Sequence, residues 1–209
     1  MRDYKIYIVD FDGTLIDSYE GLPIFYRYAF GAFGYSISDE EAYHFSKMSL
    51  EAAYIEKINK PELEKDFTKK CYEIVESDVL LPHNKLFKDT LPFINYIKEK
   101  GAPLVIVTGN SRVHVKKVLK NLGLSDYFTD IITSEDLKVQ KPDPEGIKLV
   151  LEKLHYFGEL NDVCYIGDAW NDFLAAKNAN VTPILLDRFN EYQENEDYLL
   201  IHSLTDLMN

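Results

Sequence analysis

Short, continuous runs of β-branched and other apolar residues recur along this chain and constrain its fold more than any other feature. The runs are KIYIVDF (5–11), PLVIVTG (103–109), DIITS (130–134), VCYIGD (163–168) and TPILLD (182–187). A run that is apolar throughout, rather than at alternate positions, is typical of a parallel strand covered on both faces. The sequence therefore predicts a buried parallel sheet.

Helical segments with an apolar stripe lie between several of these runs. They cover residues 90–101, 112–123 and 145–154. Thr90 is the expected N-cap of the first segment, and Gly101 and Gly123 are expected to end the first two. Strands that alternate with helices predict right-handed βαβ units, and hence an α/β fold with a doubly wound parallel sheet.

Residues 18–85 interrupt this alternation, because they contain one helical segment after another and no clear strand. Aromatic residues recur there at helical spacing, which predicts the core of a small helical bundle. The chain is 46% hydrophobic and 13% aromatic, enough for a packed core. We expect an α/β core domain (1–17 and 86–209) interrupted, soon after its first strand, by a helical domain (18–85).

The bulk charge favours some classes of partner over others. The net charge of −12 disfavours binding to nucleic acid or to an anionic membrane. A small anionic substrate stays possible, because a bound metal reverses the local field. Two lone cysteines, Cys71 and Cys164, give neither a disulfide framework nor a zinc site, and no run is long enough for a membrane span. We expect a cytoplasmic protein, monomeric or homodimeric, without a signal peptide.

Polar residues follow four of the predicted strands, at the edge where an open parallel sheet binds ligands. The first strand is followed by Asp10, Asp12, Gly13 and Thr14, and the second by Thr108, Gly109 and Asn110. The later ones are followed by Lys141, beyond a short loop, and by Asp168 and Asp172 in GDAWND. These segments are expected to meet in one crevice.

The residue types in this crevice predict phosphoryl chemistry that depends on a metal. Asp10, Asp168 and Asp172 supply hard oxygen ligands, which suit Mg²⁺ and would relieve the crowding of the carboxylates. Capping of the following helix, or holding a metal-bound water, are equal alternatives for Asp172. The hydroxyl of Thr108 and nearby backbone N–H groups, at Gly109 and Asn110, are expected to hold a phosphoryl oxygen. Lys141 would place a positive charge against the transferred group.

The paired aspartates after the first strand predict the remaining roles. Asp10 would attack phosphorus and form an aspartyl-phosphate. Asp12 would protonate the leaving oxygen and later activate water.

The motifs DFDGT, VTGN, QKPDP and GDAWND, in this order and spacing, resemble those of the haloacid-dehalogenase-like superfamily. The likeness covers residues 5–187 and is nearest to its phosphoglycolate-phosphatase-like branch, including LGLSDYFTDIITSEDL before the lysine motif. It implies a Rossmann-like core with an inserted helical cap, a nucleophilic Asp10 and an acid–base Asp12. It also implies Mg²⁺ held by Asp10, the backbone carbonyl of Asp12 and Asp168.

The resemblance leaves several activities to weigh. Dehalogenases and phosphonate hydrolases of this superfamily lack the second carboxylate, so Asp12 argues against both. Mutases of the similar branch tend to carry Gly and Arg in the cap loop, whereas this chain has Lys47 and Leu50 there. We therefore expect a phosphatase acting on a small phosphorylated metabolite, with a sugar-phosphate mutase as the alternative.

Three further points stay open. A regulatory module that is phosphorylated without turnover is the hypothesis from another class. Trp170 departs from the small residue common in that motif and would narrow the entrance or pack against the cap. The substrate would be read by residues 18–85, so phosphoglycolate, a sugar phosphate, a nucleoside monophosphate and pyrophosphate all remain.

Overall fold

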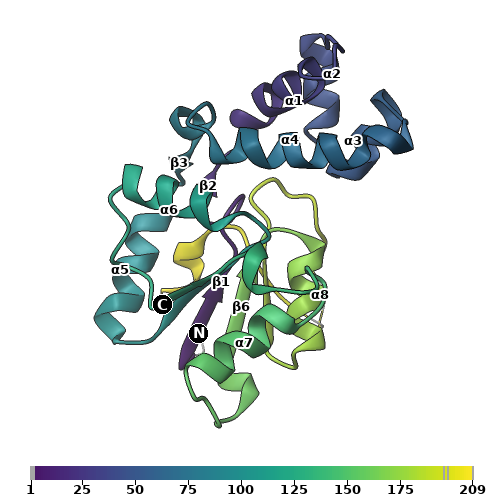
Figure 1. Cartoon of the computed structure of the whole chain (residues 1–209). Coiled ribbons are helices and arrows are strands. Elements are labelled where there is room, and N and C mark those ends of the chain that lie inside the picture. Colours follow the sequence, from purple (N-terminus) through teal and green to yellow (C-terminus); the bar gives the residue numbers. More distant parts are fainter. Residues whose placement is uncertain (1–2, 195, 197, 209) are drawn as a thin grey trace. The chain divides into compact units, whose positions relative to one another are not determined.

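The computed structural model describes residues 3–194, 196 and 198–208 (Figure 1). These residues form two compact units, one made of Met1–Ile16 with Leu86–Asn209 and the other of Asp17–Lys85. We call them the α/β unit and the helical unit.

A six-stranded parallel sheet forms the centre of the α/β unit, with the strand order β5-β4-β1-β6-β7-β8. The strands are β1 (Ile6–Val9), β4 (Leu104–Val107), β5 (Asp130–Ile132), β6 (Val163–Gly167), β7 (Thr182–Leu186) and β8 (Leu199–Ile201). The predicted α/β fold class with a parallel sheet is confirmed. The last strand, β8, was not predicted, because it is three residues long and only its final residue is buried.

Helices cover both faces of this sheet (Figure 1). They are α5 (Thr90–Lys100), α6 (Arg112–Asn121), α7 (Glu145–Lys153) and α8 (Trp170–Asn178), with the short helices η3 (Ser134–Asp136), η4 (Leu160–Asp162) and η5 (Leu204–Leu207). Ile6 and Ile8 of β1 pack in a core that includes residues of α7 and α8. Tyr7 points to the other face, since side chains alternate along a strand, and its ring meets that of Phe93 in α5.

The register of the sheet brings the ends of its central strands to one level. Val9 of β1 lies opposite Ile106 of β4 and Ile166 of β6. The residues that follow these three strands therefore emerge side by side at the carboxyl edge, the usual place for a ligand site in such a sheet.

The start of α5 corrects one prediction. Gly101 ends this helix in the left-handed conformation, with φ 68°, as expected. Thr90, however, is not the N-cap, because that position belongs to Asp89. The Thr90 hydroxyl instead donates to the carbonyl of Leu15, 2.8 Å away, and ties the helix to the loop after β1.

The helical unit contains α1 (Gly21–Gly31), α2 (Asp39–Phe45), α3 (Leu50–Lys57) and α4 (Glu64–Glu76), with the short helices η1 (Pro61–Leu63) and η2 (Leu81–His83). Its core is aromatic: Phe67 stacks on Phe30 with ring centroids 5.5 Å apart and meets the ring of Tyr54 at 4.8 Å. Such ring pairs add stability beyond the area they bury. A separate two-stranded sheet joins β2 (Ile16–Asp17) to β3 (Lys85–Leu86).

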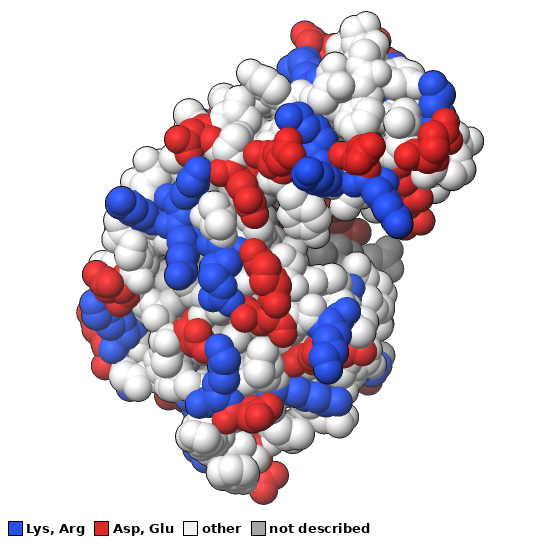
Figure 2. Space-filling model, in the orientation of Figure 1, with Lys and Arg blue, Asp and Glu red and all other residues white. Residues whose placement is uncertain are grey.

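Charged side chains of both signs are interleaved on the face of the molecule shown in Figure 2, where most basic side chains lie next to acidic ones. None of the helices in the described part of the chain is both long and apolar enough to cross a membrane.

Candidate active site

The loop after β1 places two carboxylates at the carboxyl edge of the sheet. Asp10 is 7% exposed and donates its backbone N–H to the carbonyl of Ile166, which fixes it beside β6. Gly13 turns the chain with φ +75°, and a Cβ built there would lie 2.2 Å from Oδ2 of Asp168. Glycine is therefore required at this position both for its backbone conformation and for the close approach of Asp168.

Lys141 lies between two of the predicted acids. Its Nζ is 2.7 Å from Oδ1 of Asp10 and 2.6 Å from Oδ1 of Asp172. Burial alone would lower the pKa of Lys141, but the negative charges of Asp10 and Asp172 hold it well above its usual value. The lysine is therefore a fixed positive charge within the site.

Asp172 has partners on both of its carboxylate oxygens. Oδ1 accepts from Lys141 and from the Tyr165 hydroxyl at 3.2 Å, and Oδ2 accepts from the backbone N–H of Ala169 at 3.0 Å. The contact with Ala169 satisfies an N–H at the start of α8, which is the geometry of the capping alternative for Asp172. Three donors use most of the roughly four acceptor sites of a carboxylate.

Asp168 completes a group of acids that we call the acid cluster: Asp10, Asp168 and Asp172. One carboxylate oxygen from each lies within 4.8 Å of the other two. Burial, followed by the charge of Asp172, raises the pKa of Asp168 to about 6. Burial also raises the pKa of Asp10 well above its usual value, and the neighbouring acids add to this effect, while Lys141 opposes it.

The acid cluster fits a divalent cation by its chemistry. All of its donors are hard oxygens, and ligand oxygens that share Mg²⁺ lie within about 4 Å of one another. The observed spacing is close to this limit. Burial and the neighbouring acids raise the pKa values of Asp10 and Asp168, and a bound cation would oppose that effect. The metal-binding roles of these residues stay predictions.

Thr108, Gly109 and Asn110 follow β4 at the same edge. Thr108 is buried, and its Oγ1 accepts from the backbone N–H of Asn110 at 3.1 Å. The Asn110 side chain donates from Nδ2 to Oδ2 of Asp12, 2.9 Å away. Asn110 was predicted to contact phosphate through its backbone; the structure adds a side chain that holds the acid–base candidate Asp12.

Several residues of the site lie outside the predicted motifs. Tyr165 contacts Asp172, while Arg188 donates to the backbone carbonyls after Asp12 and pairs with Asp89. Arg188 directly follows the predicted strand 182–187 at the same edge of the sheet. We call the expectation that residues following parallel strands line the ligand site the strand-end rule. Applied to this strand as well, the rule would have identified Arg188.

Trp170 packs within the α/β unit. Its ring lies 4.5 Å from Phe173, 6.0 Å from Tyr198 and 6.2 Å from Tyr192, measured between ring centroids. Trp170 is the first residue of α8 and is 44% exposed. It therefore belongs to a group of aromatic side chains and does not stand alone.

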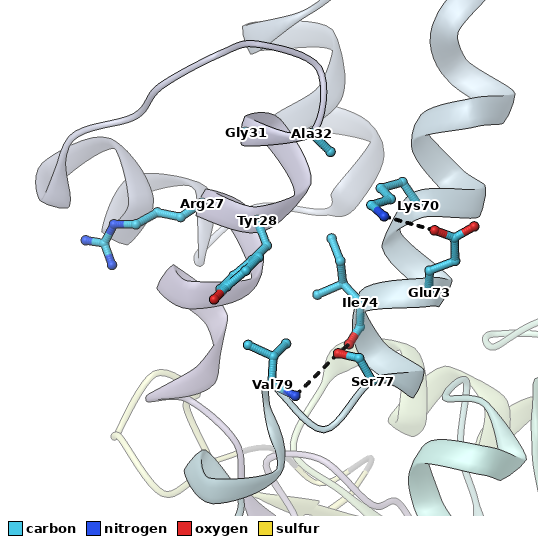
Figure 3. Close-up of a pocket in the computed structure, with 9 residues that line it drawn as sticks. All are labelled: Arg27, Tyr28, Gly31, Ala32, Lys70, Glu73, Ile74, Ser77 and Val79. Atoms are coloured by element: carbon cyan, nitrogen blue, oxygen red, sulfur yellow. Dashed lines mark hydrogen bonds and ion pairs between the residues drawn. The ribbon is translucent and has the colours of Figure 1, made fainter.

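The helical unit has a pocket of its own between α1 and α4 (Figure 3). Lys70 on its wall donates to Glu73 at 3.0 Å, and Arg27 pairs with Asp39. Both cations of the pocket wall thus have acidic partners among the described residues. Lys47, outside the pocket, lies over the ring of Tyr43.

The model of one protein family, described as haloacid dehalogenase-like hydrolase, matches residues 7–186. Two curated relatives are named phosphoglycolate phosphatase. The protein of Vibrio parahaemolyticus is 25% identical over 189 residues, covering 85% of this chain and 81% of its own length. That of Colwellia psychrerythraea is 26% identical over 204 residues, covering 93% of this chain and 89% of its own.

A solved structure is similar over the whole chain. It is a protein of Bacteroides fragilis described as haloacid dehalogenase-like hydrolase, with a TM-score of 0.83 and 28% sequence identity. The similarity covers 98% of this chain and 100% of that one.

Proposed function

The chain belongs to the haloacid dehalogenase-like hydrolases, and from this premise we propose that it is a Mg²⁺-dependent phosphatase that hydrolyses a small phosphate monoester. The family predicted from the motifs is thereby confirmed. The reaction, its metal and its substrate form the proposal.

One observation carries this proposal: a buried carboxylate, Asp10, lies in contact with a fixed cation and beside further acids. Lys141 is 2.7 Å from Asp10, and the acid cluster continues through Asp168 and Asp172. A phosphoryl group brings negative oxygens that Lys141 can bind, and it offers Asp10 an electrophilic phosphorus. A carboxylate kept only for structure would not need a second and a third acid against it.

In the first half of the proposed reaction, an oxygen of Asp10 attacks phosphorus and the bond from phosphorus to the leaving oxygen breaks. Asp12 gives its proton to that oxygen, so the product leaves as a neutral alcohol. Lys141 and the Thr108 hydroxyl hold the equatorial phosphoryl oxygens during the transfer. Asn110 keeps the Asp12 side chain in place through its 2.9 Å hydrogen bond.

In the second half, a water attacks the phosphorus of the aspartyl-phosphate and gives a proton to Asp12. The bond between phosphorus and Asp10 breaks, inorganic phosphate leaves, and both aspartates return to their starting forms. Mg²⁺, held by Asp10, Asp168 and the Asp12 carbonyl, would supply positive charge against the phosphoryl oxygens. Asp172 would act chiefly by holding Lys141, because three donors already occupy its carboxylate.

Phosphoglycolate is the first substrate to test, since the two curated relatives described above carry the name phosphoglycolate phosphatase. The helical unit, as a cap, would select among monoesters, and the boundaries of the cap at 18–85 stay a proposal. No contact among the residues that the structure describes adds support for a mutase activity.

The test is phosphate release by the purified protein from a panel of monoesters that includes phosphoglycolate, with and without Mg²⁺. We expect turnover that requires Mg²⁺ and is lost in Asp10→Asn, while the exposed-site control Asp126→Asn keeps it.

Asp12→Asn should slow turnover about 10²- to 10⁴-fold, as for loss of a general acid–base. Mass spectrometry should then detect one added phosphoryl group. Turnover that survives Asp10→Asn would contradict the proposal.

A further inference from the structure

Arg188 occupies a partly buried position just beyond β7, at the same edge of the sheet as the acid cluster. Its side chain is 10% exposed. Nε donates to the carbonyl of Gly13 at 3.2 Å, and one terminal nitrogen donates to the carbonyl of Thr14 at 2.7 Å. The guanidinium thus holds two consecutive peptide groups of the loop after β1.

Asp89 fixes the other side of the same guanidinium. The two groups form a bidentate pair with distances of 2.9 and 3.1 Å. Asp89 also accepts from the Ser203 hydroxyl and from the backbone N–H of Leu204. The guanidinium carbon lies 3.8 Å from the centre of the Phe87 ring. Since an arginine has only five N–H groups and four bonds are used here, the side chain is a structural clamp rather than a site for a substrate anion.

The two residues whose carbonyls Arg188 holds, Gly13 and Thr14, lie next to Asp168. The Thr14 hydroxyl donates to Oδ1 of Asp168 at 2.9 Å, and the missing Cβ of Gly13 leaves the space that Oδ2 of Asp168 uses. Any shift of the Gly13–Thr14 backbone would therefore move or release the Asp168 carboxylate.

We propose that Arg188, held by Asp89, is a positioning residue that fixes Asp168 through Gly13 and Thr14 and so sets the affinity of the acid cluster for Mg²⁺. This inference rests on the metal requirement of the proposed function. The chain of contacts runs from the guanidinium to two carbonyls, from Thr14 to Asp168, and from Asp168 to the cluster. Partners that orient a metal ligand commonly alter metal affinity even though they never touch the ion.

The test is calorimetric titration of the full-length protein with Mg²⁺ alone, without substrate. Arg188→Lys keeps the charge but lacks the planar fork that reaches both carbonyls and Asp89. We expect its dissociation constant for Mg²⁺ to rise about tenfold, the lower end for loss of a ligand-orienting partner.

The matched control is Arg112→Lys. Arg112 likewise donates to a backbone carbonyl, that of Ile131, and pairs with an aspartate, Asp136, but does not contact the loop after β1. Its affinity for Mg²⁺ should equal that of the wild type.

A second variant tests the route through Thr14. Thr14→Val removes the hydroxyl bond to Asp168 and leaves the bonds of Arg188 to the backbone in place. It should also weaken Mg²⁺ binding, and the double variant should lose less than the sum of the two single losses, as for residues on one path. Should Arg188→Lys fail to fold, Thr14→Val still decides, because wild-type affinity there would overturn the route.

Kinetics give a readout that a merely structural role would not move. With p-nitrophenyl phosphate as the substrate, Arg188→Lys should raise the Mg²⁺ concentration for half-maximal rate and leave KM at saturating Mg²⁺ unchanged. A folded Arg188→Lys with wild-type Mg²⁺ affinity overturns the positioning role even if the phosphatase is active. A wild type that binds Mg²⁺ but releases no phosphate overturns only the proposed function, and one that does not bind Mg²⁺ overturns both.

Discussion

Two groups of buried charges lie at the same edge of the sheet, and they differ in how well their charges balance. In the acid cluster, two of the three acids, Asp10 and Asp172, pair with the cation Lys141. The pair of Arg188 with Asp89, which we call the arginine clamp, matches one cation with one acid. Both side chains of the clamp are 10% exposed, so burial alone does not explain the difference.

The pKa directions follow this balance. Burial raises the pKa of Asp10 well above its usual value and that of Asp168 to about 6. Burial also acts to raise the pKa of Asp89, but hydrogen bonds from Arg188 and Leu204 bring it below its usual value. We therefore expect the clamp to stabilise the fold, and the cluster to keep carboxylates close together at a cost in stability. Such strain is expected where a site must receive a cation or an electrophile.

The largest effect should come from the cation that the cluster shares. Lys141→Met removes the positive charge against the transferred phosphoryl group, and we expect phosphate release to fall about 10²- to 10³-fold. The matched control is Lys153→Met, because Lys153 pairs with Asp130 at an exposed position. Equal rates in the two variants, measured at saturating Mg²⁺, would contradict the role assigned to Lys141.

Loss of the arginine clamp should lower the stability of the protein. Asp89→Asn leaves the buried Arg188 without its counter-charge, and we expect a loss of about 3 kcal/mol in the free energy of unfolding. Asp130→Asn breaks an exposed pair and should cost less than about 1 kcal/mol. Chemical denaturation followed by circular dichroism measures both losses. A clamp variant no less stable than the surface control would show that the two groups do not differ as argued.

The sequence predicted the parts of this comparison that depend on local pattern. The strands of the sheet were recognisable because each central one is apolar at every position, and this pattern placed Asp10, Thr108 and Asp168 at one edge. The positions of Asp10, Lys141 and Asp172 in the chain do not predict the distances between them. The strand-end rule nevertheless predicted that these three residues lie in one crevice. The contacts seen among them agree with that rule, while their roles stay predictions.

The position of Arg188 after a predicted strand could have been used, but the contacts of the arginine clamp escaped prediction for a physical reason. Arg188 meets Asp89 and the Gly13–Thr14 peptides across large separations in the chain, through the end of a long side chain, and no spacing pattern encodes such contacts. The same contacts explain why Thr90 was misread as the N-cap. Asp89 holds that position, but its carboxylate is turned toward Arg188, Ser203 and Leu204 instead of the first turn of α5.

A smaller effect should separate the crowding at Gly13 from its backbone conformation. Gly13 and Gly123 have φ of +75° and +72°, but only at Gly13 would an added Cβ meet another residue, Asp168. Alanine should cost about 1–2 kcal/mol at either position because of the left-handed backbone. Gly13→Ala should cost more and weaken Mg²⁺ binding in calorimetry, whereas Gly123→Ala should bind Mg²⁺ normally. Equal losses and equal affinities would remove the steric argument.

Neutralising an acid should increase the free energy of unfolding when the acid belongs to the cluster and decrease it when the acid belongs to the clamp. In metal-free buffer, Asp10→Asn removes an acid from crowded surroundings, while Lys141 keeps its pair with Asp172. We therefore expect a gain of about 0.5–2 kcal/mol in the free energy of unfolding. Asp89→Asn loses stability under the same conditions, as argued above. Addition of Mg²⁺ should favour the wild type over Asp10→Asn. A loss of stability in metal-free Asp10→Asn would mean that the cluster is not strained.

The smallest effect should be the dependence on pH of the stability that the arginine clamp contributes. An unfolded aspartate titrates near about 3.9, and the folded pKa of Asp89 lies lower. The ionised clamp therefore contributes its full stability above the unfolded value and loses it as the pH falls through the folded pKa. The difference in unfolding free energy between the wild type and Asp89→Asn should thus be constant near neutral pH and shrink below about pH 4. Denaturation curves collected with a chelator present measure this difference, and a gap that stays constant into acid would mean that Asp89 is not held ionised by Arg188.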